Sequence, residues 1–245
     1  ANNFNSNANV NSGCTYDVLG CTDSDANNYN LNANEDDNSC EYLKYPIHKN
    51  IMTTYFWVGE DASEDNSWIS NHHSAWDEDW VNHFGGIDNP DCRDGYQPCG
   101  FTAKENTFYC ALPYSDFDDQ GPKVNRLDVP WYEEVDDQTS VIKNRWVKVI
   151  FNGKEAYCQL EDAGPGSSDD FAYVFGNAAP IHDIGLDVSP AVRDYLGLDG
   201  MDQTNWQFVD DEDVISGPWK EIVTSSGTCW GSSCKEDEPV DPVET

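Results

Sequence analysis

One segment near the middle of the chain constrains the fold more than any other. Residues 146–160 read WVKVIFNGKEAYCQL, in which Asn152-Gly153 is a dipeptide typical of a two-residue β-hairpin turn. Pairing outward from this turn places Val149 opposite Ala156. Because side chains alternate along a strand, the hairpin presents one apolar face, which we expect to lie in the core: Val147, Val149, Phe151, Ala156 and Cys158.

Other elements can be located from local signals. Residues 51–58 are β-branched and aromatic, which favours a strand, and a last strand is expected at 205–209. One helix has clear end signals. Ser189 suits its N-cap, Pro190 its first position and Gly197 its C-terminal stop. The long stretch 59–119 is rich in Gly, Asp, Asn and aromatic residues, and we expect it to form ordered loops.

The net charge narrows the possible partners. Thirteen basic against 46 acidic residues give a formal net charge of −33. Such a chain repels phosphate backbones and anionic lipid, which excludes nucleic acid as a direct partner. No apolar run approaches the roughly 20 residues of a membrane span, so membrane insertion is not expected. Nine cysteines and only two methionines favour an oxidising, extracellular compartment.

Composition divides the chain into three parts. Residues 1–43 contain no Lys or Arg, and residues 1–40 contain twelve Asn. The chain ends in KEDEPVDPVET, an acidic, proline-containing sequence typical of a linker. We therefore expect Cys/Asn/Asp-rich repeats at 1–42, a main domain at 43–225, and a small disulfide loop with a linker-like tail at 226–245.

An internal repeat accounts for the odd number of cysteines. Residues 1–14 (ANNFNSNANVNSGC) and 26–40 (ANNYNLNANEDDNSC) repeat one motif, and the second copy is preceded by GCTD at 20–23. The motif resembles the short GCTD…DDGSC repeats found in tandem in secreted proteins of marine bacteria. If Cys21 pairs with Cys40, Cys14 needs a partner outside this segment, and we expect the native polypeptide to continue N-terminally.

The six remaining cysteines allow three bridges. Two would close short local loops, Cys92–Cys99 and Cys229–Cys234. The third, Cys110–Cys158, would be a long-range bridge, with a buried thiol at Cys158 as the alternative. Because sequence does not fix connectivity, these pairings are hypotheses.

Oxygen ligands alternate in the complete repeat. Its Asp and Asn side chains stand at i, i+2 and i+4 and are followed by two further carboxylates, a pattern that suits calcium. The spacing is not that of an EF-hand. A solvated acidic loop is the alternative. The candidate ligands are Asp23, Asp25, Asn27, Asp36 and Asp37.

Two further motifs indicate a barrel family. Residues 161–165 (EDAGP) and 186–189 (LDVS) stand where the D-R-G-P and I-D-L-S motifs occur in the double-psi β-barrel of rare-lipoprotein-A-like proteins. The chain is similar to that family over roughly residues 51–60 and 105–210. The same barrel underlies expansins and family 45 endoglucanases. The resemblance implies a mainly β fold, a six-stranded barrel with long loop excursions and one or two short helices.

The resemblance also implies candidate catalytic residues. Asp162 matches the catalytic Asp of the lytic transglycosylases, but the family His before Leu-Pro is replaced by Tyr109. Asp187 stands where family 45 endoglucanases carry their acid. Asp116 and Glu161 are further candidates, since glycoside hydrolysis needs two carboxylates. Structural roles in turns and caps are the alternative for Asp162 and Asp187.

Aromatic residues and the repeats leave two functions open. Aromatic rings can stack on sugars or simply cover the barrel ends, and the candidates for stacking are Tyr55, Trp57, Trp76 and Trp131. The first function is a secreted protein that cleaves or binds a polysaccharide, with Asp162 as general acid. The second is a structural subunit of an extracellular fibre or surface assembly, whose partner is a further copy of itself. The barrel alone does not choose between them.

Overall fold

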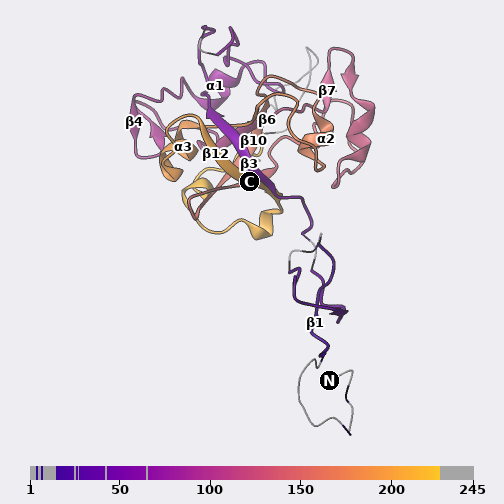
Figure 1. Cartoon of the computed structure of the whole chain (residues 1–245). Coiled ribbons are helices and arrows are strands. Elements are labelled where there is room, and N and C mark those ends of the chain that lie inside the picture. The colour runs from indigo at the N-terminus through magenta and orange to yellow at the C-terminus, as the bar shows by residue number, and fades with distance from the viewer. Residues whose placement is uncertain are drawn as a thin grey trace, which may run out of the picture. The chain divides into compact units, whose positions relative to one another are not determined.

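The chain folds as two compact units, Ala1–Tyr45 and Pro46–Thr245. The computed structural model describes the following residues of these units: 4, 7, 15–24, 26, 28–41, 43–64 and 66–226. The barrel and all the helices described below belong to the second unit (Figure 1).

The first unit is small and held by one covalent link. Strand β1 (Leu19–Gly20) runs parallel to β2 (Glu35–Asp36). Cys21 and Cys40 form the disulfide expected for the complete repeat. The Asn34 side chain accepts a hydrogen bond from the Val18 N–H at 2.8 Å, which joins the two arms. Cys14 lies outside the described residues.

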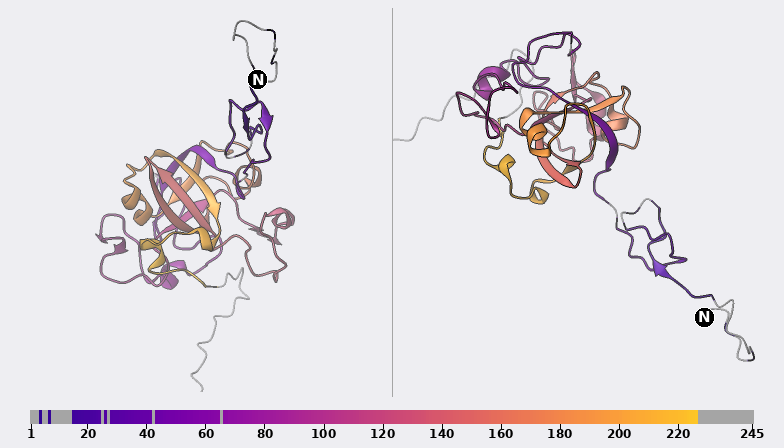
Figure 2. Two further views of the ribbon diagram at one scale, coloured as in Figure 1. Left: turned by 90° about the horizontal axis from the view of Figure 1, so that it is seen from below. Right: turned by 60° about the vertical axis from the view of Figure 1, so that its left-hand side comes forward.

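Six strands of the second unit close into a barrel in the order β10-β6-β11-β3-β12-β9 (Figure 2). The pairs β10/β6 and β11/β3 are parallel and the others antiparallel. The expectation of a mainly β fold with a six-stranded barrel is therefore confirmed. The barrel strands are β3 (His48–Tyr55), β6 (Tyr109–Leu112), β9 (Trp146–Phe151), β10 (Lys154–Ala163), β11 (Ile184–Val188) and β12 (Asp202–Val209).

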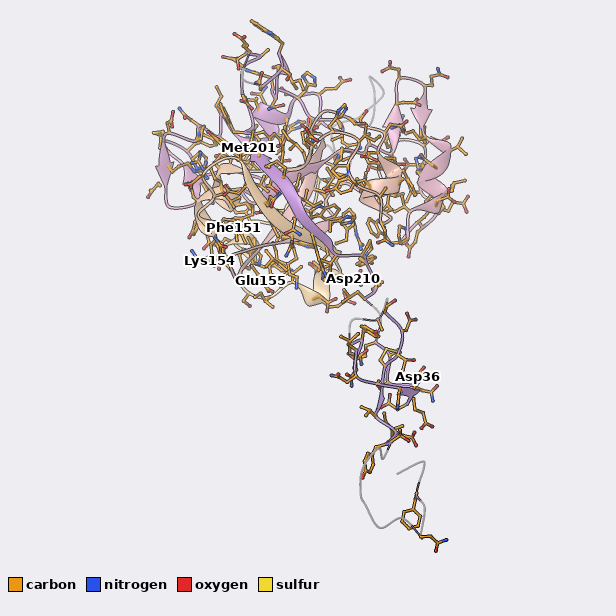
Figure 3. The ribbon with its side chains drawn as sticks, in the orientation of Figure 1. Asp36, Phe151, Lys154, Glu155, Met201 and Asp210 are labelled. Carbon is orange, nitrogen blue, oxygen red and sulfur yellow. A yellow bond between two sulfur atoms is a disulfide. The ribbon has the colours of Figure 1, made fainter. Side chains whose placement is uncertain are left out.

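The hairpin register is confirmed. Val149 pairs with Ala156 and Val147 with Cys158, and Figure 3 shows Phe151 and Lys154 at the turn of the β9–β10 hairpin. Strand β3 begins three residues before the expected position, because its pairing with β12 extends to His48, whose ring stacks on Trp206 at 4.0 Å.

The helices are short. Helix α3 (Pro190–Leu196) has the expected ends: Ser189 Oγ accepts from the Val192 N–H at 3.3 Å, and Gly197 takes a left-handed φ of 78°. Three α-helices are described rather than one or two, and none is long and apolar enough to cross a membrane. The remaining elements are α1 (Trp80–Phe84), α2 (Phe171–Val174), the 3-10 helices η1 (Val124–Asp128), η2 (Asp211–Asp213) and η3 (Pro218–Lys220), and the two-residue strands β4 (Arg93–Asp94), β5 (Gln97–Pro98), β7 (Phe117–Asp118) and β8 (Gly121–Pro122).

The long excursion between β3 and β6 packs on the outside of the barrel. Side chains alternate along β6, so Tyr109 and Ala111 point outward while Cys110 and Leu112 point inward. Tyr109 and Ala111 contribute to an apolar cluster with five residues from β3's end and the excursion: Phe56, Val58, Trp80, Phe84 and Ala103. Burial of this cluster supplies the driving force that holds the excursion on the barrel.

The Tyr109 hydroxyl ties this cluster together. It donates a hydrogen bond to Asp88 Oδ2 at 2.9 Å and accepts one from the Val58 N–H at 3.0 Å. Asp88 also pairs with Arg93, at the start of a hairpin (β4–β5) that the expected Cys92–Cys99 disulfide closes. One buried hydroxyl thus connects β6 with two points of the excursion.

The expected bridge between Cys110 and Cys158 is wrong. Both cysteines are free and buried. Cys110 pairs in register with Leu160, not with Cys158, and each thiol lies near a backbone carbonyl, of Gln159 for Cys110 and of Val147 for Cys158. Packing and strand pairing, not this bridge, hold the described barrel. Cys229 and Cys234 lie outside the described residues.

Alkylation tests the assignment of the thiols. In denatured but unreduced protein, iodoacetamide should label Cys110 and Cys158, because no bridge protects them once the barrel opens. Mass spectrometry should find Cys21, Cys40, Cys92 and Cys99 labelled only after reduction. Protection of Cys110 and Cys158 before reduction would contradict the structure.

Replacing Tyr109 tests the hydroxyl's role. Tyr109→Phe should lower the free energy of unfolding by about 2 kcal/mol, because the buried Asp88 carboxylate and the Val58 N–H each lose a partner. Tyr157→Phe is the matched control: that hydroxyl makes one long contact of 3.4 Å with Glu155, so its loss should cost less than about 1 kcal/mol. Equal losses in urea unfolding of the two variants would refute this role.

Candidate functional site

Two aspartates face each other across strand β6 on the outer face of the barrel. Ala111 pairs with Asp162 of β10 on one side and with Asp187 of β11 on the other. Asp187 in turn pairs with Thr54 of β3. The four residues form one row across four neighbouring strands, so the backbones of the aspartates are two strand spacings, about 10 Å, apart. Ala111 lies between them in this row.

A β-bulge places Asp162 in this row. Leu160 pairs with Cys110, but the next pair along the strands is Asp162 with Ala111, which leaves Glu161 as the extra residue. Without the bulge, Glu161 would stand opposite Ala111 and Asp162 would point into the barrel, because a one-residue slip exchanges the faces of a strand. The bulge therefore creates the pair of facing aspartates.

The environment of Asp162 favours its protonated form. Its Oδ1 accepts hydrogen bonds from the Ala75 N–H at 2.7 Å and the Ala163 N–H at 2.8 Å. The pKa of Asp162 is raised to about 7, mainly by burial and less by the charge of Asp187, and the two N–H donors oppose the shift only in part. Part of its surface remains exposed, so solvent reaches it.

Asp187 also has a raised pKa. Burial is the main cause and the charge of Glu60 a smaller one, a hydrogen bond from the Thr54 hydroxyl opposes the shift, and the pKa is about 6. The two groups interact, so they titrate as a coupled pair. The pair therefore exchanges its protons near neutral pH.

A loop of the excursion begins and ends beside this pair. The Asn71 N–H donates to the Glu60 carbonyl at 2.9 Å, and the Asn71 side chain donates to Glu60 Oε2 at 2.8 Å, which closes the loop at its base. Its outer part presents Trp68, which is 72% exposed. Ser67 and Trp68 both have left-handed backbone angles, φ 56° and 63°, an unfavourable conformation for such residues. The backbone thus holds an indole ring in solvent.

Two of the other three candidate catalytic residues, Tyr109 and Asp116, are buried and fully engaged. Tyr109 is inaccessible, and burial followed by the charge of Asp88 raises the pKa of its hydroxyl well above the ordinary value. Asp116 is also inaccessible and accepts from Trp76 Nε1, Ser140 Oγ and the Val141 N–H. These contacts give both side chains structural roles.

The predicted aromatic residues divide into two groups. Tyr55 and Trp57 stack at 6.0 Å with the Arg193 guanidinium 4.6 Å from the Tyr55 ring, and both remain partly exposed. Trp76 is buried against Asp116. Trp131 donates to the Val141 carbonyl at 2.7 Å and packs edge-on against Phe208. The first pair keeps ring surface for a ligand, whereas the second two cover the core.

The predicted calcium ligands fall in the first unit. Asp36 and Asp37 accept hydrogen bonds from the backbone N–H groups of Asn38 and Ser39, which are turn contacts. Asp25 and Asn27 lie outside the described residues. Within the part of the chain that the structure describes, no three acidic, His or Cys side chains gather to hold a metal. Calcium binding therefore stays a prediction.

Sequence reasoning did not identify three residues of the site. Thr54, Glu60 and Ala75 contact or influence the two aspartates from β3 and the excursion. Thr54 directly precedes the predicted stacking residue Tyr55, but only the β3–β11 register shows that it faces Asp187. Ala75 contributes a backbone N–H, for which a sequence carries no signal.

Comparisons with known proteins add no relative: no protein-family model matches the chain, and no curated protein is significantly similar to it.

The raised pKa of Asp162 predicts how stability depends on pH. The folded state binds this proton more tightly than the unfolded state, whose Asp pKa is near 3.8. The resulting stabilisation is present below pH 4 and is lost as pH rises through about 7. Asn keeps the Oδ1 acceptor and cannot ionise. Asp162→Asn should therefore gain stability over the wild type by a few kcal/mol between pH 4 and 8.

A second variant provides a control of opposite sign. Hydrogen bonds from the Gln138 N–H and the Thr139 hydroxyl lower the pKa of Asp136. Its contribution is present above pH 4 and lost as pH falls, so Asp136→Asn should be relatively less stable at high pH. Thermal melts of all three proteins from about pH 2 to 8 measure both trends. A pH-independent difference between Asp162→Asn and the wild type would contradict the assignment.

Proposed function

We propose that this protein is a secreted, glycan-cleaving enzyme built on a double-psi β-barrel, with Asp162 as its general acid. The observation that carries the proposal is the pair of neighbouring carboxylates on one outer face, whose pKa values are raised, mainly by burial, to about 7 and about 6. Two carboxylates with different proton affinities are what glycoside hydrolysis requires. The interlocked parallel pairs β10/β6 and β11/β3 support the double-psi assignment.

Asp162 is suited to donate a proton. Both N–H donors bind the same oxygen, Oδ1, and thereby favour the carbonyl character of that atom. No described residue donates a hydrogen bond to Oδ2, which is the oxygen that would carry the proton to the glycosidic oxygen. A pKa near 7 keeps the acid protonated at near-neutral pH and makes transfer efficient.

Asp187 would act from the opposite side. Ionised above pH 6, it would accept a proton from a water that attacks the anomeric carbon while the bond from that carbon to the leaving oxygen breaks. The leaving oxygen takes the Asp162 proton, so the protons balance over one turnover. The Thr54 hydroxyl orients the Asp187 carboxylate by its hydrogen bond.

Several features support a polysaccharide substrate and an extracellular location. The Tyr55–Trp57 pair and the exposed ring of Trp68 offer apolar surfaces of the kind on which sugar rings stack. A net charge of −33 disfavours anionic polymers. The two disulfides of the described chain, Cys21–Cys40 and Cys92–Cys99, are typical of an oxidising compartment.

The test is product release from defined glycans. We expect the wild type to release soluble oligosaccharides from at least one of peptidoglycan, cellulose, chitin and algal glucans, with greatest activity between about pH 6 and 7. Asp162→Asn and Asp187→Asn should each lose at least about a hundredfold in rate, as expected for the loss of a general acid or base. Mass spectrometry detects the products and distinguishes reducing ends, which indicate hydrolysis, from anhydro ends.

Asp183→Asn is the matched control, because Asp183 is an exposed aspartate just before β11 and should leave the rate unchanged. Equal activity of Asp162→Asn and the wild type would refute the role of Asp162. Absence of products from the wild type across the whole panel would refute the enzyme proposal and favour the structural-subunit alternative, for which filaments should then be visible by electron microscopy.

A further inference from the structure

A buried ion pair lies directly behind the site. Lys143 Nζ is 3.1 Å from Glu161 Oε2, and the two side chains are only 3% and 2% exposed. Glu161 is the extra residue of the β-bulge that turns Asp162 outward. The ion pair therefore holds the side chain of Glu161. Because Glu161 is left out of the β6–β10 pairing, Asp162 joins the row of Thr54, Asp187 and Ala111.

The Lys143–Glu161 pair lies within a group of buried polar side chains. The Lys143 ammonium also donates to Ser226 Oγ at 3.3 Å, and Trp80 Nε1 donates to a second buried carboxylate, Glu105, at 3.1 Å. Burial opposes charge on Lys143, but Glu161 and Glu105 outweigh it and raise the pKa of the ammonium. Burial also raises the pKa of Glu161 to about 7, and Lys143 limits the rise. Lys143 is thus the charge that makes burial of Glu161 tolerable.

Backbone hydrogen bonds from residues 144 and 145, next to Lys143, bind β10 just before the bulge. The Asn144 N–H donates to the Leu160 carbonyl at 2.9 Å, and the Leu160 N–H donates to the Arg145 carbonyl at 2.9 Å. The segment 143–145 therefore holds both the strand just before the bulge and the side chain of the bulged residue. Loss of the side-chain contact would leave a register shifted by one residue as the competing arrangement.

We propose that the Lys143–Glu161 ion pair is a positioning device, which holds the bulge in β10 and so keeps the Asp162 carboxylate on the outer face beside Asp187. Neither residue contacts the substrate in this role. The catalytic meaning of the device depends on the function proposed above. The structural claim does not, because the position of Asp162 can be measured without a substrate.

The test follows Asp162 directly in three variants. Lys143→Met removes the ammonium, Glu161→Gln removes the carboxylate charge but keeps its shape, and the double variant K143M/E161M leaves no unpaired buried charge if the first fails to fold. The Ala75 amide, which donates to Asp162 Oδ1, should exchange with solvent about tenfold faster in Lys143→Met and in the double variant. Glu161→Gln should give a smaller increase, because Gln can still accept a hydrogen bond from Lys143. The carboxyl-carbon NMR titration of Asp162 should move upward from about 7, because the competing register turns this carboxyl into the barrel, where burial favours the protonated form.

The matched control is Lys148→Met, which breaks the Lys148–Glu155 pair of 3.6 Å between β9 and β10. Figure 3 shows Glu155 near the hairpin turn. Lys148→Met should alter neither the Ala75 amide nor the Asp162 titration. Wild-type values for both readouts in Lys143→Met and in the double variant would overturn the proposal. If the variants shift both readouts while the wild type cleaves no glycan, the positioning role stands and the proposed enzymatic function fails.

Discussion

The pairing of strand β6 is the constraint on which the rest of the structure depends. β6 contains only four residues, yet it runs parallel to β10 and antiparallel to β11. Because of this mixed pairing, residues from strands of opposite direction stand side by side in one row across the sheet, and Ala111 has an aspartate on each side. The outward face of the same strand also carries Tyr109, whose hydroxyl fastens the excursion. The site and its cover are thus built on one short strand.

Three carboxyl groups close to β6 lie in surroundings that oppose their ionisation. Asp162, Asp187 and Glu161 all have raised pKa values, because burial disfavours their charged forms. Burying carboxyl groups opposes folding at neutral pH. Other buried carboxyl groups of the described chain, such as Asp88 and Asp116, lie in structural hydrogen-bond networks, whereas Asp162 and Asp187 remain partly exposed, which makes these two the candidates for chemistry.

Local features of this fold can be predicted from the sequence, whereas contacts between strands that are far apart in the sequence are predicted less well. The Asn152-Gly153 turn fixed the β9–β10 register, and Ser189 and Gly197 marked the ends of α3, because turn and cap preferences act within a few residues. The same reasoning failed for Cys110 and Cys158, which lie on neighbouring parallel strands whose register no turn determines. Asp162 and Asp187 were identified one by one, through a family resemblance. Their facing arrangement depends on the bulge at Glu161, and a bulge leaves no mark in the hydrophobic pattern.

The two free thiols inside the barrel impose an order of events during folding. In an oxidising compartment an exposed thiol pairs with any other that it meets, and the described chain places Cys110 and Cys158 among strands far apart in sequence. They stay reduced only if the barrel closes around them before oxidation reaches them. The disulfides at Cys21–Cys40 and Cys92–Cys99 join residues 19 and 7 positions apart and can form early from local encounters. Barrel closure therefore buries Cys110 and Cys158 away from the four cysteines that form the two described disulfides.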